Sequence, residues 1–95
     1  MELTFSGVVW EWRGPSPFHF VTVPEDESGL LESMSLLVTY GWGMIPVEAA
    51  IGLTRWTTSL FPKDRLYVVP LKSAVRQAER IAIGDIVNVH LGVAL

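Results

Sequence analysis

The pattern of hydrophobic and polar positions predicts that most of the chain is β-strand. Residues 3–12 place one row of side chains, Leu3 to Val9, on one face and a second row, Thr4 to Trp12, on the other. Because both rows are largely apolar, we expect this strand to be covered on both faces. A turn is predicted at 13–17, where Gly and two prolines lie close together, and residues 18–23 should form an antiparallel second strand.

A helix is predicted to begin at the acidic segment 24–28, because carboxylates are favoured in the first turn of a helix. Helical spacing places a set of apolar residues on one face, which we expect to be buried: Leu30, Leu31, Met34, Leu37 and Val38. The glycines of 40–43 should end this helix. They lack the Gly-Lys-Ser/Thr continuation of a phosphate-binding loop.

The second half of the chain reads as a hairpin followed by a strand, a helix and a last strand. Strands are expected at 45–51 and 54–61, joined by a tight Gly52-Leu53 turn, with Pro46 indicating an edge or the start of a strand. A turn at 62–65 leads to a short strand, 66–69, that Pro70 should stop.

The predicted second helix spans residues 71–80. Leu71, Val75 and Ala78 are expected on its buried side, and a basic stripe lies on its open side. A Gly-Asp turn precedes the last strand, 86–94, in which alternate residues from Val87 to Val93 face inward. Six or seven short strands with short connections predict a single mainly-β domain, residues 1–95. The expected architecture is a small closed or nearly closed barrel with a short helix at each end.

Composition adds an expectation about association and location. The hydrophobic fraction is 49%, with four Trp and four Phe, so we expect a homodimer or larger homo-oligomer to cover part of the surface. No apolar run is long enough to span a bilayer, and residues 1–12 lack the basic start of a signal peptide, so a cytoplasmic location without membrane contact is expected. The chain has no Cys, which excludes disulfides and thiolate metal sites.

Charge is unevenly distributed, since residues 1–50 carry seven acids and one base, whereas residues 51–95 carry six bases and three acids. The asymmetry is compatible with a basic face for an anionic partner or with ordinary surface decoration. With a net charge of -3, nucleic acid is an unfavourable partner, because such binding is dominated by neutralised phosphates.

The best candidate ligand site lies on the strand and helix that flank Pro70. Its residues are Arg55, Trp56, Ser59, Lys72 and Arg76, which could hold a small anion such as a carboxylate or phosphate. The alternative is structural, with Arg76 paired to Asp85 or Glu79.

Other chemistry finds little support in the sequence. Ser59 has no recognisable base or nucleophile motif, and His19 and His90 have no metal-ligand spacing, so no catalytic residue, metal or cofactor is expected. The aromatic residues are expected mainly in the core, with a groove for stacking on nucleic-acid bases as the alternative: Trp10, Trp12, Trp42, Trp56, Phe18, Phe61 and Tyr67.

Two resemblances arise from these segments. Residues 69–76, followed by 84–89, resemble the Pro-led helix and Gly-Asp-strand half of AbrB and MazE type swapped-hairpin domains. Over nearly its whole length the chain resembles a family of small bacterial and archaeal domains of unknown function, sometimes fused to a YdeI/OmpD-associated domain. The matching elements are Phe5, 20–24, 45–47, Trp56, 58–62, Tyr67, 70–72, 75–76 and 84–85. This resemblance implies a double-split β-barrel and no established activity, although the segment 63–66 lacks the Gly that such members tend to carry.

The combined hypothesis is a non-enzymatic binding or interaction module. Two alternatives stay open: a nucleic-acid-binding regulator of the AbrB and MazE type, and a small-anion-binding or enzymatic site at the mouth of the barrel. A concentrated basic face would favour the first, and an enclosed pocket with convergent polar groups would favour the second.

Overall fold

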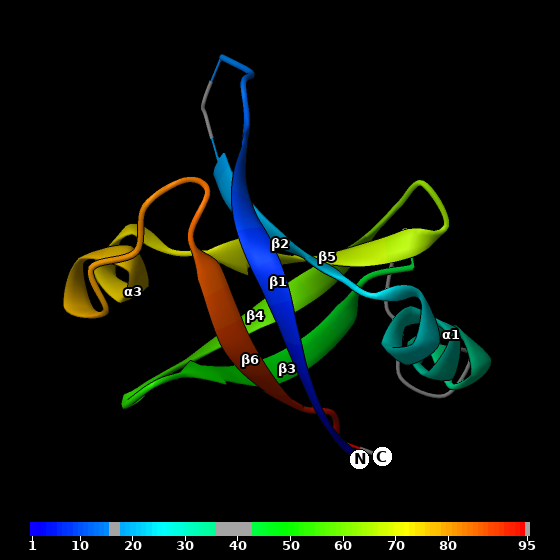
Figure 1. The fold of residues 1–95 in the computed structure, drawn as a ribbon. Coiled ribbons are helices and arrows are strands. Elements are labelled where there is room, and N and C mark those ends of the chain that lie inside the picture. The colour runs from blue at the N-terminus through cyan, green and yellow to red at the C-terminus, as the bar shows by residue number, and fades with distance from the viewer. Residues whose placement is uncertain (16–17, 36–42, 95) are drawn as a thin grey trace.

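A computed structural model of the chain describes residues 1–15, 18–35 and 43–94, which form a closed barrel of six strands (Figure 1). The strands are β1 (Glu2–Trp12), β2 (Phe18–Val23), β3 (Ile45–Ile51), β4 (Thr54–Lys63), β5 (Leu66–Leu71) and β6 (Ile86–Gly92). The helices of these described ranges are α1 (Glu25–Ser33) and α3 (Ser73–Ala78). They lie at opposite ends of the barrel, against β5 and β4 respectively (Figure 1). The predicted mainly-β barrel with two short capping helices is confirmed.

Two long strands change partner along their length, so the barrel is split at two places. Strand β1 pairs with β6 over residues 2–8 and with β2 over residues 9–12. Strand β4 pairs with β3 over residues 54–60 and with β5 over residues 61–63. All pairings are antiparallel, and the order β1-β2-β5-β4-β3-β6 closes between β6 and β1. This is the double-split arrangement that the family resemblance implies.

Alternation along the strands separates the interior of the barrel from its outer surface. The inward rows form one core: Leu3, Phe5, Val9, Val21, Val23, Ile45, Val47, Ala49, Ile51, Trp56, Leu60, Tyr67, Val69, Leu71, Val87, Val89 and Leu91. The prediction that β1 is covered on both faces is wrong. Val8 and Trp12 on its second row are exposed, because that row lies on the outside of the barrel.

Helix α1 begins where the acidic segment predicts, but it buries a different face. Leu31 is fully buried, whereas Leu30 is exposed and the hydroxyl-bearing Ser28 is buried in its place. A helix of nine residues docked against one strand can bury only a narrow stripe, so adjacent apolar residues cannot both face the barrel. Helix α1 ends at Ser33, so the prediction that it continues to the glycines of 40–43 is wrong. The predicted contributions of Leu37 and Val38 lie outside the described residues.

Ser28 joins α1 to the barrel through its hydroxyl. Its Oγ donates to the carbonyl of Val23 (2.9 Å) and accepts from the backbone N–H of Tyr67 (3.1 Å). Val23 and Tyr67 are register partners, so the hydroxyl bridges the end of the β2–β5 ladder. Burial, with the Glu32 carboxylate nearby, raises the pKa of the Tyr67 phenol. The neutral phenol therefore stabilises the fold below its ordinary pKa, and this contribution is lost as pH rises through the raised value.

The prediction that Pro70 stops its strand is wrong, because β5 continues to Leu71 and Pro70 pairs with Phe20 of β2. The carbonyl of Pro70 points toward β4, where it accepts the indole N–H of Trp56 (3.3 Å). A strand residue directs its N and its C=O to the same side, and the described β4–β5 register ends at Val68. The missing N–H of Pro70 therefore faces a part of β4 outside that register.

Predictions for Pro46 and for the second helix meet different outcomes. Pro46 lies at the start of β3, where the β6 ladder does not reach, which agrees with its predicted position. Helix α3 spans only Ser73–Ala78, because Leu71 belongs to β5, and Ala78 is exposed rather than buried. Val75 is buried as predicted.

In the described part of the chain, no helix is long and apolar enough to cross a membrane.

Two tight turns connect the central strands. Gly52-Leu53 joins β3 to β4 as predicted, with Gly52 at a φ of 58°. The β4–β5 turn is tighter than predicted, because β4 runs to Lys63 and only Asp64 and Arg65 connect the strands. Both residues have positive φ, 52° and 67°. Two consecutive left-handed residues are the geometry of a type I′ hairpin turn, in which glycine is favoured.

Arg65→Gly is therefore expected to stabilise the protein by about 1 kcal/mol, because glycine adopts a positive φ without the steric cost that a Cβ imposes. Urea unfolding of the wild type and the variant measures the difference. Gly84→Ala is the control with the opposite expected sign. Gly84 has a φ of 92°, so adding a Cβ there should destabilise the protein. A loss of stability in Arg65→Gly would show that the arginine side chain, rather than its backbone angle, decides the energy of this turn.

Candidate functional sites

The residues proposed for anion binding each have an environment of their own in the structure. Arg55 lies on the outer face of β4, where its Nη1 is 3.7 Å from Oε1 of Glu48 on β3, and both side chains are exposed. Lys72, at the N-cap position of α3, donates from Nζ to the backbone carbonyl of Thr57 (2.8 Å). The two bases are thus near the same strand, but each already has an oxygen partner.

The other three residues of that set have different environments. Trp56 is buried inside the barrel and holds the Pro70 carbonyl. Ser59 is half-buried on β4 and has an interaction partner. Arg76 is half-buried, and its Nε is buried without a hydrogen-bond partner among the described residues.

The ion pair expected between Arg76 and either Asp85 or Glu79 is not among the salt bridges of the described residues. Asp85 instead accepts the backbone N–H of Ala82 at Oδ2 (2.8 Å), and Glu79 accepts the hydroxyl of Thr54 at Oε2 (2.6 Å). Both carboxylates therefore stabilise turns next to α3, and neither neutralises the guanidinium.

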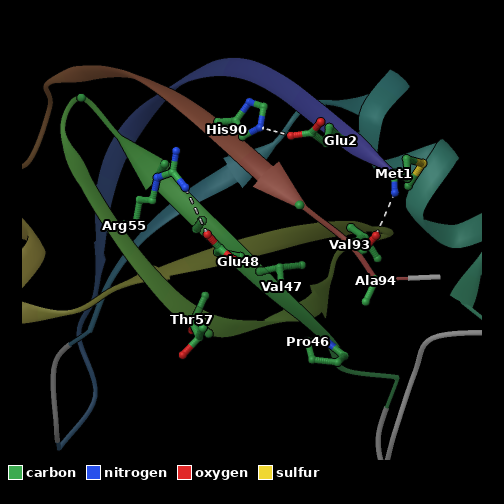
Figure 2. A pocket seen from close by; sticks show the side chains of 15 residues that line it. Met1, Glu2, Pro46, Val47, Glu48, Arg55, Thr57, His90, Val93 and Ala94 are labelled. Carbon is green, nitrogen blue, oxygen red and sulfur yellow. Dashed lines mark hydrogen bonds and ion pairs between the residues drawn. The ribbon is translucent and has the colours of Figure 1, made fainter.

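A cleft of about 840 Å³, which we call the charged cleft after its two ion pairs, opens over the outer faces of β3, β4 and the end of β6 (Figure 2). Its floor includes Gly92, which pairs with Glu2 of β1 on one side and with Glu48 of β3 on the other. The two carboxylates thus flank a position that has no side chain. Figure 2 shows Glu2 paired with His90 on one wall, through Oε1 and Nε2 at 2.7 Å, and Glu48 paired with Arg55 on the other.

The chemistry available in the charged cleft is limited by these pairings. Each carboxylate already has a basic partner, and His90 Nδ1 also lies 3.1 Å from the hydroxyl of Thr4. The described residues contain no group of three or more side chains of the types His, Cys, Asp and Glu that could hold a metal ion. Of the predicted anion-site residues, Arg55 lines this cleft, whereas Lys72 and Arg76 do not.

A second concavity, of about 440 Å³, lies on the outer surface formed by β1, β2, β5 and the end of β4. We call it the aromatic groove, and its lining residues are Trp10, Trp12, Phe18, Phe20, Phe61, Pro62, Lys63, Val68 and Pro70. The strand register builds it in rows, because Trp12 is opposite Phe18, and Trp10 is opposite Phe20, which is opposite Pro70.

The rings of the aromatic groove are held against one another. The ring centroids of Trp10 and Phe20 are 5.2 Å apart, and those of Phe18 and Phe20 are 6.1 Å apart, at tilted angles. Nζ of Lys63 lies 6.0 Å from the Trp10 ring centroid, within cation–π range. Val68 forms the floor and is only 3% exposed, although it lies outside the barrel core.

The expectation that the aromatic residues fill the core is wrong for four of the seven. Trp56 and Tyr67 are buried, but Trp10, Trp12, Phe18 and Phe61 line the groove, and Trp42 lies outside the described residues. The sequence carried a signal for this, because both tryptophans of β1 belong to the row that alternation places opposite Phe5 and Val9. It gave no sign that Phe20 and Pro70 would complete the same surface, because that depends on the register of β1, β2 and β5.

Comparison with known protein families supports the resemblance at a general level. A family model described as "Domain of unknown function (DUF1905)" matches residues 5–91, from Phe5 in β1 to Leu91 in β6. A comparison with the curated proteins finds no match. The match covers all six strands in whole or in large part, together with both described helices. The chain therefore belongs to the DUF1905 family, a domain family of unknown function.

Proposed function

We propose that this domain is a non-enzymatic binding module and that its binding surface is the aromatic groove. The observation that carries the proposal is the set of large rings on the outside of the barrel, where the core does not need them. Trp12, Phe18 and Phe61 are all exposed, whereas Val68, which lines the same groove, is only 3% exposed. An exposed, concave aromatic surface on a small domain is typical of interaction sites.

The charged cleft is the weaker binding surface despite its larger volume. Its carboxylates and bases are mutually paired, and exposed ion pairs of this kind contribute only about 0–1 kcal/mol. A charged ligand would have to replace a partner that each group already has. Both volumes fall within the range of about 300–1,000 Å³ common to ligand pockets, so volume does not separate the two surfaces. The rings of the aromatic groove can contact an apolar ligand without displacing an ion pair.

Binding of the dye anilinonaphthalene sulfonate tests the proposal. The wild type is expected to enhance its fluorescence, because the groove shields an apolar probe from water, and Trp12→Ala should lose most of the enhancement. Leu53→Ala is the matched control, since Leu53 is exposed in the β3–β4 turn, away from the groove. Equal enhancement in the two variants, both shown to be folded by their unfolding curves, would contradict the proposal.

Self-association is a second candidate function, favoured by two exposed apolar residues that do not line the groove. Val8 and Ile86 are opposite one another in the β1–β6 register and are both exposed. Light scattering at tens of micromolar protein is expected to give a dimer mass, and Ile86→Asp should give a monomer, because a desolvated carboxylate is costly at an interface. A monomer mass for the wild type would remove this candidate.

The regulator that the AbrB and MazE resemblance suggests receives less support, as does the anion site at Arg55, Trp56, Ser59, Lys72 and Arg76. Three of the seven bases are in ion pairs with acids: Arg13 with Glu11, Arg55 with Glu48, and Lys63 with Asp64. Duplex DNA binding follows the number of phosphates that a protein can neutralise. We therefore propose that duplex DNA is not a partner. Submicromolar binding that weakens steeply with added salt would favour the regulator instead.

A further inference from the structure

The hydrogen-bonding groups of the aromatic groove restrict what it can bind. None of its nine lining side chains is an acceptor, whereas Trp10, Trp12 and Lys63 carry donors. The indole N–H of Trp10 is already used, since it donates to the hydroxyl of Thr22 (2.9 Å). The indole N–H of Trp12 makes no hydrogen bond to any described residue. The groove therefore offers hydrogen-bond donors at Trp12 and Lys63, and its lining side chains include no hydrogen-bond acceptor.

A ligand suited to this surface accepts hydrogen bonds but needs to donate few. An ordinary extended peptide would bring an N–H group with every residue, and the groove side chains could satisfy none of them. Proline has no N–H, and a proline-rich segment adopts the polyproline II conformation, in which the backbone carbonyls remain free to accept. Grooves lined by aromatic rings are a general way to bind such segments.

Charge at the rim argues against single-stranded nucleic acid. Lys63 has Asp64 as its partner at 3.1 Å, and Arg13, beyond the end of β1, has Glu11 at 3.4 Å. A surface that binds single strands needs an excess of positive charge along the backbone path, in addition to rings for stacking. The Lys63 ammonium has three N–H donors, of which one is used by Asp64, so this single lysine is better matched to one further acidic side chain than to a row of phosphates.

The exposed area argues against a second folded copy as the occupant. Trp12, Phe18 and Phe61 are 45%, 51% and 40% exposed. With about 150–250 Å² for each aromatic side chain, they offer roughly 200–350 Å² together. A stable protein–protein interface covers about 800 Å² on each partner. The groove is therefore suited to a short segment, and neither Val8 nor Ile86 is among its lining residues.

The dimensions of the groove agree with a polyproline II ligand. The row Trp10, Phe20 and Pro70 crosses three adjacent strands, which spans about 9.6 Å at the usual strand spacing. In polyproline II, residues i and i+3 lie on the same side, about 9.3 Å apart. Two prolines separated by two residues can thus contact the two ends of this row.

From these observations we infer that the aromatic groove binds a short proline-rich segment in the polyproline II conformation, with an acidic residue of the ligand at Lys63. The inference rests on the proposed function, because it names the ligand class of the same groove. Trp12 donates its indole N–H to a ligand carbonyl, and the rings contact the proline side chains.

The test uses a synthetic proline-rich peptide that ends in two glutamates, titrated against the wild-type chain. Calorimetry measures Kd, and the NMR signal of the Trp12 indole N–H reports the contact. We expect micromolar binding and a shift of that signal. Trp12→Phe keeps a ring but loses the donor, so Kd should rise about tenfold. Lys63→Gln should weaken binding of the acidic peptide and leave binding of a peptide ending in two glutamines unchanged. This comparison separates the effect of the ligand's charge from that of its shape.

Control ligands make the outcomes distinguishable. A glycine-serine peptide with the same two glutamates should not bind, and neither should a short oligothymidylate. If the proline-rich peptide fails while the dye still binds in a Trp12-dependent way, the ligand class is wrong and the proposed function stands. If the dye also fails, both are wrong. Binding of the oligothymidylate with a similar shift of Trp12 would assign the groove to single-stranded nucleic acid.

Discussion

Leu60→Ala is expected to destabilise the protein by about 2–5 kcal/mol, whereas the same substitution at Leu53 should change stability by no more than about 0.5 kcal/mol. Leu60 points into the barrel and is 0% exposed, while Leu53 lies in the β3–β4 turn and is 99% exposed. Removing the Leu60 side chain leaves a cavity that a closed barrel cannot easily collapse, because each strand is fixed by a neighbour on both sides.

Urea unfolding followed by tryptophan fluorescence measures both variants against the wild type. The two changes remove the same atoms, so the difference between them isolates burial from the intrinsic properties of leucine and alanine. Since small domains are stable by only about 5–15 kcal/mol, the Leu60 variant should unfold at a clearly lower urea concentration. Similar midpoints for the two variants would mean that the interior of the barrel is much more loosely packed than the burial of Leu60 indicates.

The sequence predicts the interior of this barrel well because a strand has a period of two, so one row of each strand must face the core. The inward row of β6, from Val87 to Leu91, follows directly from this rule. Short connections then limit the number of possible folds, and the chain closes as expected. The two strands that change partner follow from the family resemblance, because nothing in the residues of β1 marks the point between Val8 and Val9 where one partner replaces the other.

The outer surface could not be predicted in the same way. Alternation shows that Trp10 and Trp12 share a row, but it does not show whether another element covers that row. The answer depends on which residues β2 and β5 bring beside β1, and that register is a property of the whole barrel. A local rule also failed at Pro70, because a proline is tolerated within a strand where the neighbouring ladder is absent.

The partners of the candidate anion-site residues could not be predicted for a related reason. Arg55, Lys72 and Arg76 are close in the predicted order of elements, but long basic side chains find the nearest oxygen acceptor. For Arg55 this is a carboxylate on β3, and for Lys72 it is a backbone carbonyl on β4. Neither acceptor can be identified without the positions of the neighbouring strands. For the aromatic groove, alternation in the sequence shows which residues of each strand share a face. Only the strand register shows that these faces form one surface.

The bridge formed by Ser28 is the clearest case of a polar residue whose importance the hydrophobic pattern hides. Ser28 is 1% exposed, and its Oγ both donates to Val23 and accepts from Tyr67. Ser28→Ala is therefore expected to cost about 2–4 kcal/mol, because two buried backbone groups lose their partner at once and water cannot easily replace it. Ser33→Ala in the same helix is the matched control. Ser33 donates to the Leu30 carbonyl at an exposed position, so its loss should change stability by about 0.5 kcal/mol or less.

Two measurements together identify the cause of the effect. Urea unfolding gives the loss of stability, and native-state hydrogen exchange follows the Tyr67 amide, which should lose protection more than its neighbours in β5 when the Ser28 hydroxyl is removed. The hydroxyl acts at the junction of α1, β2 and β5, so exchange near β6 should change only through the global loss of stability. If Tyr67 keeps its protection relative to the rest of β5 in Ser28→Ala, the serine only fills space, and the docking of α1 depends on Leu31 alone.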